Sequence, residues 1–140
     1  MGESLPQSVL RRIVEEVGKE PGRFSEIVAS YLPLLMEYVA PILRSDRRAY
    51  ARFRYVFVNS WRHAFGEEIP PPDFEGVYDY EVLISKLMQH IADYADRVPV
   101  VLRLRGIYPA VEVEKRIRLL LSRVLFGTVL DLLRYEGIIP

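Results

Sequence analysis

Cysteine is absent from the 140-residue chain, which excludes a disulfide framework, a cysteine nucleophile and a zinc site built on thiolates. The sequence also has no uninterrupted apolar run of about 18 residues, the length that crosses a bilayer. No apolar segment typical of a secretory signal follows Met1. Half of the residues are hydrophobic and the length fits one domain, so we expect a single α-helical domain over residues 1–140.

Side-chain amides and threonine are scarce: the chain has one asparagine, two glutamines and one threonine, beside 10 prolines. This composition suits a protein selected at high temperature and predicts a thermophilic source. The basic residues are 16 arginines and 3 lysines, a bias that a GC-rich genome also produces. Arginine still matters physically, because its guanidinium group binds phosphate and carboxylate groups through two parallel hydrogen bonds and stacks on aromatic rings.

The net charge is zero, but the charges are segregated along the chain. Residues 44–63 contain six arginines against Asp46, a balance of +5, and residues 97–123 contain seven bases against two glutamates, again +5. Residues 64–96, between these blocks, contain eight acids against Lys86, a balance of −7. Either the blocks pair within the chain and face solvent, or the basic blocks face a polyanion while the acidic block meets basic surfaces of neighbouring copies.

Apolar residues recur at spacings of three and four along most of the chain, which predicts an all-α bundle of about five helices. The second helix contains Pro33 and Pro41, which should kink or split it. Residues 1–22 form a possible N-terminal helical arm whose helix is capped by Ser4. The helices are expected over about 5–17, 25–43, 47–65, 80–97 and 110–135.

Two connecting segments complete the expected fold. Residues 67–79 include three consecutive prolines and Gly76, which indicates a stiff loop. Residues 100–108 alternate weakly around Arg103 and Arg105, so a strand and a short helix are both open.

The helix expected over 47–65 carries two stripes. Its core stripe consists of Tyr50, Phe53, Phe57, Trp61 and Ala64. Its second stripe follows 4, 3, 4, 3 spacing, with His63 beside it, and consists of Arg48, Arg52, Tyr55, Asn59 and Arg62. Such a row of donors can bind successive phosphates of a nucleic acid without reading the bases. The alternatives are a solvated face paired with the acidic segment 67–81, or a protein partner.

A second basic surface is expected from the block at 97–123, where it would contact the same duplex or the acidic loop of an adjacent subunit. Its candidate residues are Arg103, Arg105, Arg116 and Arg123. Because exposed ion pairs are weak singly, only a repeated array of them would matter for assembly.

The last helix is apolar nearly all round between Leu119 and Leu133, apart from a narrow basic stripe of Arg116, Arg123 and Arg134 beside Gly127. A helix of this kind must be surrounded on most sides. We therefore expect neighbouring subunits to bury it, and the alternative is a central helix within one chain. The expected subunit-contact residues are Leu121, Leu125, Phe126, Val129 and Leu132.

Catalytic and metal-binding patterns are missing from the sequence. His63 and His90 lie on separate helices without a histidine four residues away, so neither forms a local metal-ligand pair. The acids of residues 67–81 lack the ordered spacing of a calcium loop. No glycine-rich phosphate loop and no nucleophile elbow occurs. We expect a non-enzymatic protein without metal, cofactor or small-molecule substrate.

In four features the chain resembles the major coat proteins of filamentous viruses of hyperthermophilic archaea. These are the chain length, the proline-containing helix around Pro33 and Pro41, the stripe of Arg48, Arg52 and Arg62, and the apolar last helix. The resemblance implies a structural subunit of the virion that binds double-stranded DNA without sequence specificity. It also implies that the bound DNA is in the A form. The subunit would pair with a second copy of itself, or with a related coat-protein chain as a heterodimer, and the pairs would assemble into a helical filament. An envelope is compatible with this family.

Two other classes of protein fit the same sequence. One is a non-catalytic small subunit of an archaeal nucleic-acid-processing complex in the cytoplasm, such as a primase accessory subunit or a CRISPR effector small subunit. The other is a protein–protein adaptor without a nucleic-acid role. Three observations would distinguish these classes. A coat protein forms open filaments, a complex subunit occurs at a fixed low copy number beside larger partners, and an adaptor shows no salt-dependent DNA binding.

Overall fold

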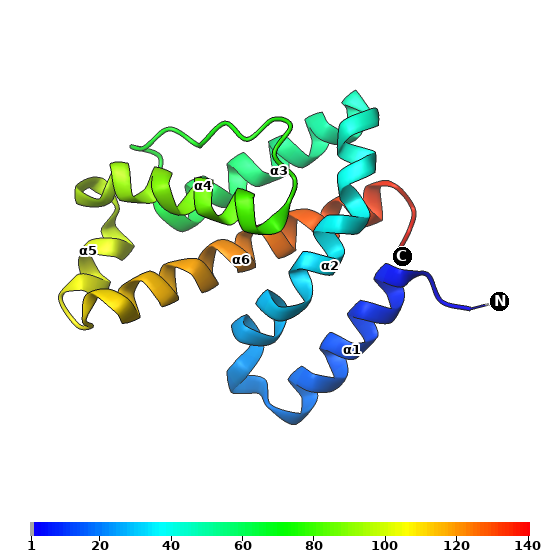
Figure 1. Ribbon diagram of the computed structural model, residues 1–140, viewed down its shortest axis with the longest axis horizontal. Helices are drawn as coiled ribbons and strands as arrows, with labels where there is room; N and C mark the ends of the chain where they lie inside the picture. The colour runs from blue at the N-terminus through cyan, green and yellow to red at the C-terminus, as the bar shows by residue number, and fades with distance from the viewer. Residues whose placement is uncertain (1) are drawn as a thin grey trace.

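The computed structural model describes residues 2–140, which form six α-helices and two single-turn 3₁₀ helices, with no strand among them. The all-α prediction is confirmed. The elements are α1 (Leu5–Lys19), η1 (Pro21–Arg23), α2 (Phe24–Ser45), α3 (Arg47–Phe65), α4 (Tyr80–Asp93), η2 (Ala95–Arg97), α5 (Pro99–Arg105) and α6 (Ala110–Tyr135). Figure 1 shows α6 running through the length of the molecule, with α1 and α2 toward one end and α4 and α5 toward the other.

Polar side chains fix the starts of three helices. The Ser4 hydroxyl accepts a hydrogen bond from the Gln7 backbone N–H, and the Gln7 side chain accepts one from the Ser4 backbone N–H, which makes a capping box. The Asp46 carboxylate accepts from the first turn of α3, and Asp79 caps α4 in the same way. Because these caps are local in sequence, they place the helix starts near the positions that the sequence predicts.

Helix α2 contains both prolines and is not split: it runs as one helix through Pro33 and Pro41 (Figure 1). Each proline removes one backbone donor from the helix. The helix is nevertheless held by eight buried residues that pack against α1, α3, α4 and α6. These are Ile27, Val28, Leu32, Leu35, Met36, Val39, Ala40 and Leu43. The segment Pro21–Ser45 is long and apolar enough to span a bilayer by length and composition, a test that core helices of globular proteins also pass.

The expected arm lies against the domain in this structure, apart from Met1, which is outside the described residues. Helix α1 packs along α2 and buries Pro6, Val9 and Ile13 (Figure 1). The Gln7 side chain also donates a hydrogen bond of 3.2 Å to the Ile138 carbonyl near the other end of the chain.

Between α4 and α6 the chain differs from the sequence prediction in two places. Helix α4 ends at Asp93 rather than near residue 97, and the η2 turn follows it. Val98 is extended, because the residue before a proline is disfavoured in the α conformation. Residues 100–108, where a strand and a helix were both open, contain the short helix α5, which raises the number of α-helices to six.

An aromatic row lines the inner side of α3. Phe53, Phe57, Trp61 and Phe65 recur at four-residue spacing and are all fully or almost fully buried. The loop between α3 and α4 returns across this row and inserts Phe74, whose ring meets that of Phe57 edge-on at 4.7 Å. Ile69 and Tyr78 of the same loop are also buried. The loop is therefore anchored by its apolar side chains, while its acids point outward.

Candidate nucleic-acid interface

The predicted stripe on α3 lies on the side of the helix opposite the aromatic row. Arg48, Arg52, Tyr55, Asn59 and Arg62 are all exposed. From Arg48 to Arg62 the stripe extends about 21 Å at the helical rise of about 1.5 Å per residue. Helix α3 contains no acidic residue, so no carboxylate of its own neutralises the stripe.

Helix α6 packs against α3 and presents a second exposed stripe on its outer side. This stripe consists of Arg116, Arg123, Gly127 and Arg134. It extends about 27 Å along the helix. Between residues 115 and 135 the only acid of α6 is Asp131. Together the exposed stripes of α3 and α6 form one cationic surface, which we call the α3–α6 face.

Asp131 joins the two helices at one point of this face. The Arg52 guanidinium donates two hydrogen bonds of 2.8 Å to the Asp131 carboxylate, and it also lies over the Tyr135 ring at 5.8 Å. The hydrogen bonds to Arg52 lower the pKa of Asp131, against the opposing effect of its partial burial. The same pair raises the pKa of Arg52. Arg52 is therefore positioned by the fold, with its charge already largely compensated.

Four other arginines of the two stripes have no such partner. Within residues 2–140, no carboxylate forms an ion pair with Arg48, Arg62, Arg123 or Arg134. The acidic segment 67–81, proposed as an alternative partner of the α3 stripe, pairs instead with Arg118 through a contact of 2.9 Å to Glu81. The structure therefore does not show the alternative in which this acidic segment pairs with the stripe, because the loop crosses the opposite side of α3.

The border of the face at η1 carries acids, but these are occupied. Glu20 and Glu26 both pair with Arg23, at 3.2 and 3.3 Å. The first residue of α2, Phe24, contacts Phe126 edge-on, and the Arg123 guanidinium lies 5.8 Å from the centre of the Phe24 ring. This cation–π contact places Arg123 beside the face without neutralising its charge.

The predicted second basic surface is not one surface in the structure. Arg116 and Arg123 belong to the α6 stripe, although Arg116 also pairs with Glu112 at 3.0 Å and stacks on the Tyr108 ring at 4.0 Å. Arg103 and Arg105 lie on α5, beyond the start of α6, and Arg105 approaches Asp96 at 3.5 Å. The charge block is continuous in sequence, but the turn at Pro109 separates α5 from the outer side of α6.

The five residues expected at a subunit contact are buried within the single chain. Leu121, Leu125, Val129 and Leu132 are fully buried and Phe126 is 8% exposed. Helices α2, α3, α4 and α5 of the same chain all pack against α6. The expectation that other subunits must cover these side chains is therefore wrong: α6 is the central helix of one bundle, and between residues 117 and 133 its exposed residues, Arg123 and Gly127, belong to the outer stripe.

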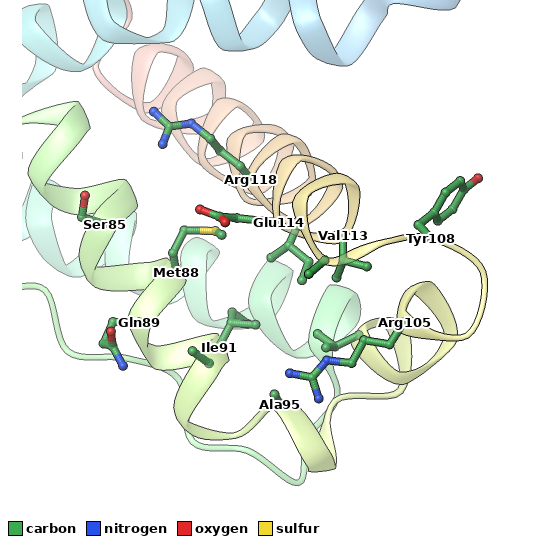
Figure 2. Close-up of a pocket in the computed structure, with 14 residues that line it drawn as sticks. Ser85, Met88, Gln89, Ile91, Ala95, Arg105, Tyr108, Val113, Glu114 and Arg118 are labelled. Atoms are coloured by element: carbon green, nitrogen blue, oxygen red, sulfur yellow. The ribbon is translucent and has the colours of Figure 1, made fainter.

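A groove of about 740 Å³ lies between α4, α5 and α6 at the other end of the molecule (Figure 2). Its walls are mainly apolar and include Met88, Ile91 and Val113. Its polar residues carry both signs and include Glu114, Arg105 and Arg118. Since these arginines already lie near Asp96 and Glu81, the groove offers a polyanion no net attraction.

Among the described residues, no group of three histidine, cysteine or acidic side chains is arranged to hold an ion. His63 is exposed beside the α3 stripe. His90 contacts the Pro70 carbonyl at 2.7 Å and packs against Trp61. Both positions agree with packing and surface roles.

The α6 stripe was predicted from the sequence, but Arg134 and Gly127 were not among the predicted binding residues. Their spacing from Arg116 and Arg123 was the available signal, because residues 116, 123, 127 and 134 share one side of a helix. The adjacency of this stripe to α3 could not be read from spacing.

Comparisons with protein-family models, characterised proteins and solved structures found no match to this chain.

Proposed function

We propose that this protein is a structural nucleoprotein subunit that binds double-stranded DNA without sequence specificity through the α3–α6 face. The observation that carries the proposal is that two basic helix stripes lie side by side on one surface. The only acid in the central part of these stripes is Asp131, and it is paired with Arg52. Unpaired guanidinium groups spaced over 20 to 30 Å suit the phosphates of a duplex, where they displace condensed counterions.

The shape of the face favours contacts to the backbone over base reading. A single α-helix, about 10–12 Å wide, fits the major groove of B-form DNA. Two packed helices with axes about 8–10 Å apart present a surface about 20 Å wide, which is too broad to enter that groove. The arginines would therefore contact phosphates, and such contacts fix position without selecting a sequence.

A coat role further requires contacts between copies, and the buried leucines of α6 are not available for them. Exposed apolar side chains do occur at the α5 end of the molecule, where Leu102, Ile107 and Val111 are 49%, 66% and 82% exposed. The acids of the loop between α3 and α4 lie outside the α3–α6 face and are complementary in charge to Arg103 of a neighbouring copy. These features support self-association, or association with a related chain, along bound DNA in a virion.

The proposal is tested by the salt dependence of duplex binding. Fluorescence anisotropy with a short labelled duplex should give an affinity that falls log-linearly with salt and is equal for unrelated sequences. The combined Arg48→Ala, Arg52→Ala and Arg62→Ala variant should bind at least tenfold more weakly. Its log–log salt slope should be smaller by about 1.8, since Arg48 and Arg62 each contribute about 0.9 while the charge of Arg52 is already compensated by Asp131.

The matched control replaces three exposed arginines away from the face, Arg11, Arg12 and Arg97, by alanine and should bind like the wild type. Equal loss in both triple variants would reduce the proposal to an effect of net charge. No loss in the α3 variant would refute it. Electron microscopy of the wild type with long DNA should show regular filaments, whereas discrete particles of fixed copy number would favour the subunit of a processing complex.

A further inference from the structure

The seam between α3 and α6 contains an open hollow of about 530 Å³ in the middle of the α3–α6 face, which we call the seam hollow. Its floor is formed by Ala64 of α3 and by Leu120, Val124 and Gly127 of α6. Its rim is formed by four side chains that can donate hydrogen bonds: Asn59, Ser60, His63 and Arg123.

The rim donors are free to meet a ligand. Among the described residues, none of these four side chains donates a hydrogen bond to the protein or pairs with a carboxylate. No acidic residue lines the hollow. The Arg123 guanidinium is oriented at one edge by its contact with the Phe24 ring. An amide, a hydroxyl, an imidazole and a guanidinium around one opening make a set of donors that suits an anion with several oxygen acceptors.

Gly127 gives a second, independent observation. Glycine is unfavourable in the middle of a helix, yet Gly127 lies deep within the 26-residue α6. A methyl group added at this position would meet no atom within 4 Å, so packing within the chain does not require a glycine. Its φ is not positive, so the backbone does not require one either. The missing side chain keeps the floor of the hollow low, which permits close approach from outside.

We propose that the seam hollow is a phosphate-binding subsite that seats one phosphodiester group of the duplex between α3 and α6. Arg123 and His63 supply the charged or ionisable donors, and Asn59 and Ser60 supply neutral ones. The subsite rests on the proposed DNA-binding function and refines it. Arg52 lies seven residues from Asn59 along α3, about 10 Å away, so neighbouring phosphates of the same backbone could reach both positions.

The test fills the hollow without changing charge. Gly127→Leu should bind the short duplex at least fivefold more weakly than wild type, with a log–log salt slope smaller by about 0.9, the value for one phosphate contact. Gly18→Leu is the matched control, because Gly18 is also helical and its added side chain also meets open space. It should bind like wild type. Thermal melts should show both variants folded.

Nuclear magnetic resonance separates the two sources of phosphate. The duplex should shift the Gly127 and His63 amide signals of the wild type, and inorganic phosphate at the same ionic strength should shift them only at much higher concentration. Saturation by inorganic phosphate as tightly as by duplex would make the hollow a free-anion site and overturn the proposal.

The remaining outcomes distinguish this subsite from the proposed function. If Gly127→Leu binds duplex like wild type while the α3 triple variant does not, the hollow is no subsite and the DNA-binding face stands. If neither variant loses affinity, both proposals fail. If Gly127→Leu reduces the mass of an oligomer in light scattering without affecting DNA binding, the hollow receives a second copy of the chain, and the phosphate assignment is wrong.

Discussion

The inner and outer sides of α6 belong to the same helix and serve opposite purposes. The inner side contributes Leu121, Leu125 and Leu132 to the core and is covered by the other helices of the chain. The outer side carries Arg116, Arg123 and Arg134 around Gly127 and is open. A helix that is apolar over most of its circumference can therefore be buried by the other helices of one small bundle. The part of its surface that can contact a partner is then the narrow stripe that is not apolar.

A charge placed on the inner side of α6 should have the largest effect on the protein. Leu125→Asp should destabilise the fold by about 3–5 kcal/mol, because it removes a buried apolar side chain and buries a carboxylate. Since small domains have only about 5–15 kcal/mol of stability, chemical denaturation should show a largely unfolded or strongly weakened protein. Arg123→Asp on the outer side should melt near the wild-type temperature. A folded Leu125→Asp variant that merely loses self-association would restore the subunit-contact interpretation.

Removing charge from the outer side should reduce binding without unfolding. The Arg123→Ala and Arg134→Ala double variant is expected to bind duplex about tenfold more weakly, with a salt slope smaller by about 1.8. Anisotropy titrations at several salt concentrations measure both quantities. Arg103→Ala with Arg105→Ala on α5 is the control with the same change in net charge, and its affinity should fall less than threefold. An equal loss in the α5 variant would mean that the duplex extends to that end of the molecule.

Removing the carboxylate of Asp131 should strengthen DNA binding by the outer side of α6 rather than weaken it. Asp131→Asn removes the only acid of the central α6 stripe region and releases Arg52 for phosphate. Duplex affinity should rise about two- to fivefold and the salt slope should grow by about 0.9. Glu15→Gln, which removes a carboxylate paired with Arg11 on α1, should leave DNA binding unchanged. A weaker Asp131→Asn complex would show that Arg52 acts only when it is held in place.

The smallest effect concerns acid stability. Because Arg52 lowers the pKa of Asp131 in the folded protein, the pair stabilises the fold above the ordinary carboxyl pKa of about 3.9. This contribution is lost as the pH falls below that value and through the lowered folded pKa. Because the pair lies near the surface, solvent screening keeps this contribution small. Melting temperatures between pH 7 and pH 3 should therefore fall slightly less in Asp131→Asn than in wild type.

Local signals predicted most helix boundaries, although α4 ends at Asp93 rather than near residue 97. Asp46 and Gly66 bracket α3, and Pro109 and Gly137 bracket α6, so caps and breakers near in sequence were sufficient. The proline-containing helix was also recognised, but whether it breaks depends on packing along its whole length. Such packing comes from residues distant in sequence, which periodicity within one helix does not report.

The candidate site was predictable in part for the same reason. Spacing placed Arg48, Arg52 and Arg62 on one exposed side of α3. The pairing of Arg52 with Asp131 joins residues 79 positions apart, and the seam hollow combines donors from two helices. Charge blocks suggested that some surface would be basic, but only the packing of α3 on α6 determines which arginines share it and which, like Arg103, do not.

The chain has a single tryptophan, Trp61, and its fully buried ring lies on the side of α3 opposite the arginine stripe, in contact with Phe65 and His90. Its emission should be blue-shifted in the native protein and should move to the red when the aromatic row opens. Because the ring is shielded from ligands at the outer surface, the signal reports folding alone. Fluorescence recorded during a DNA titration therefore provides an internal reference, so that a variant's lost affinity and its lost structure can be read separately from one cuvette.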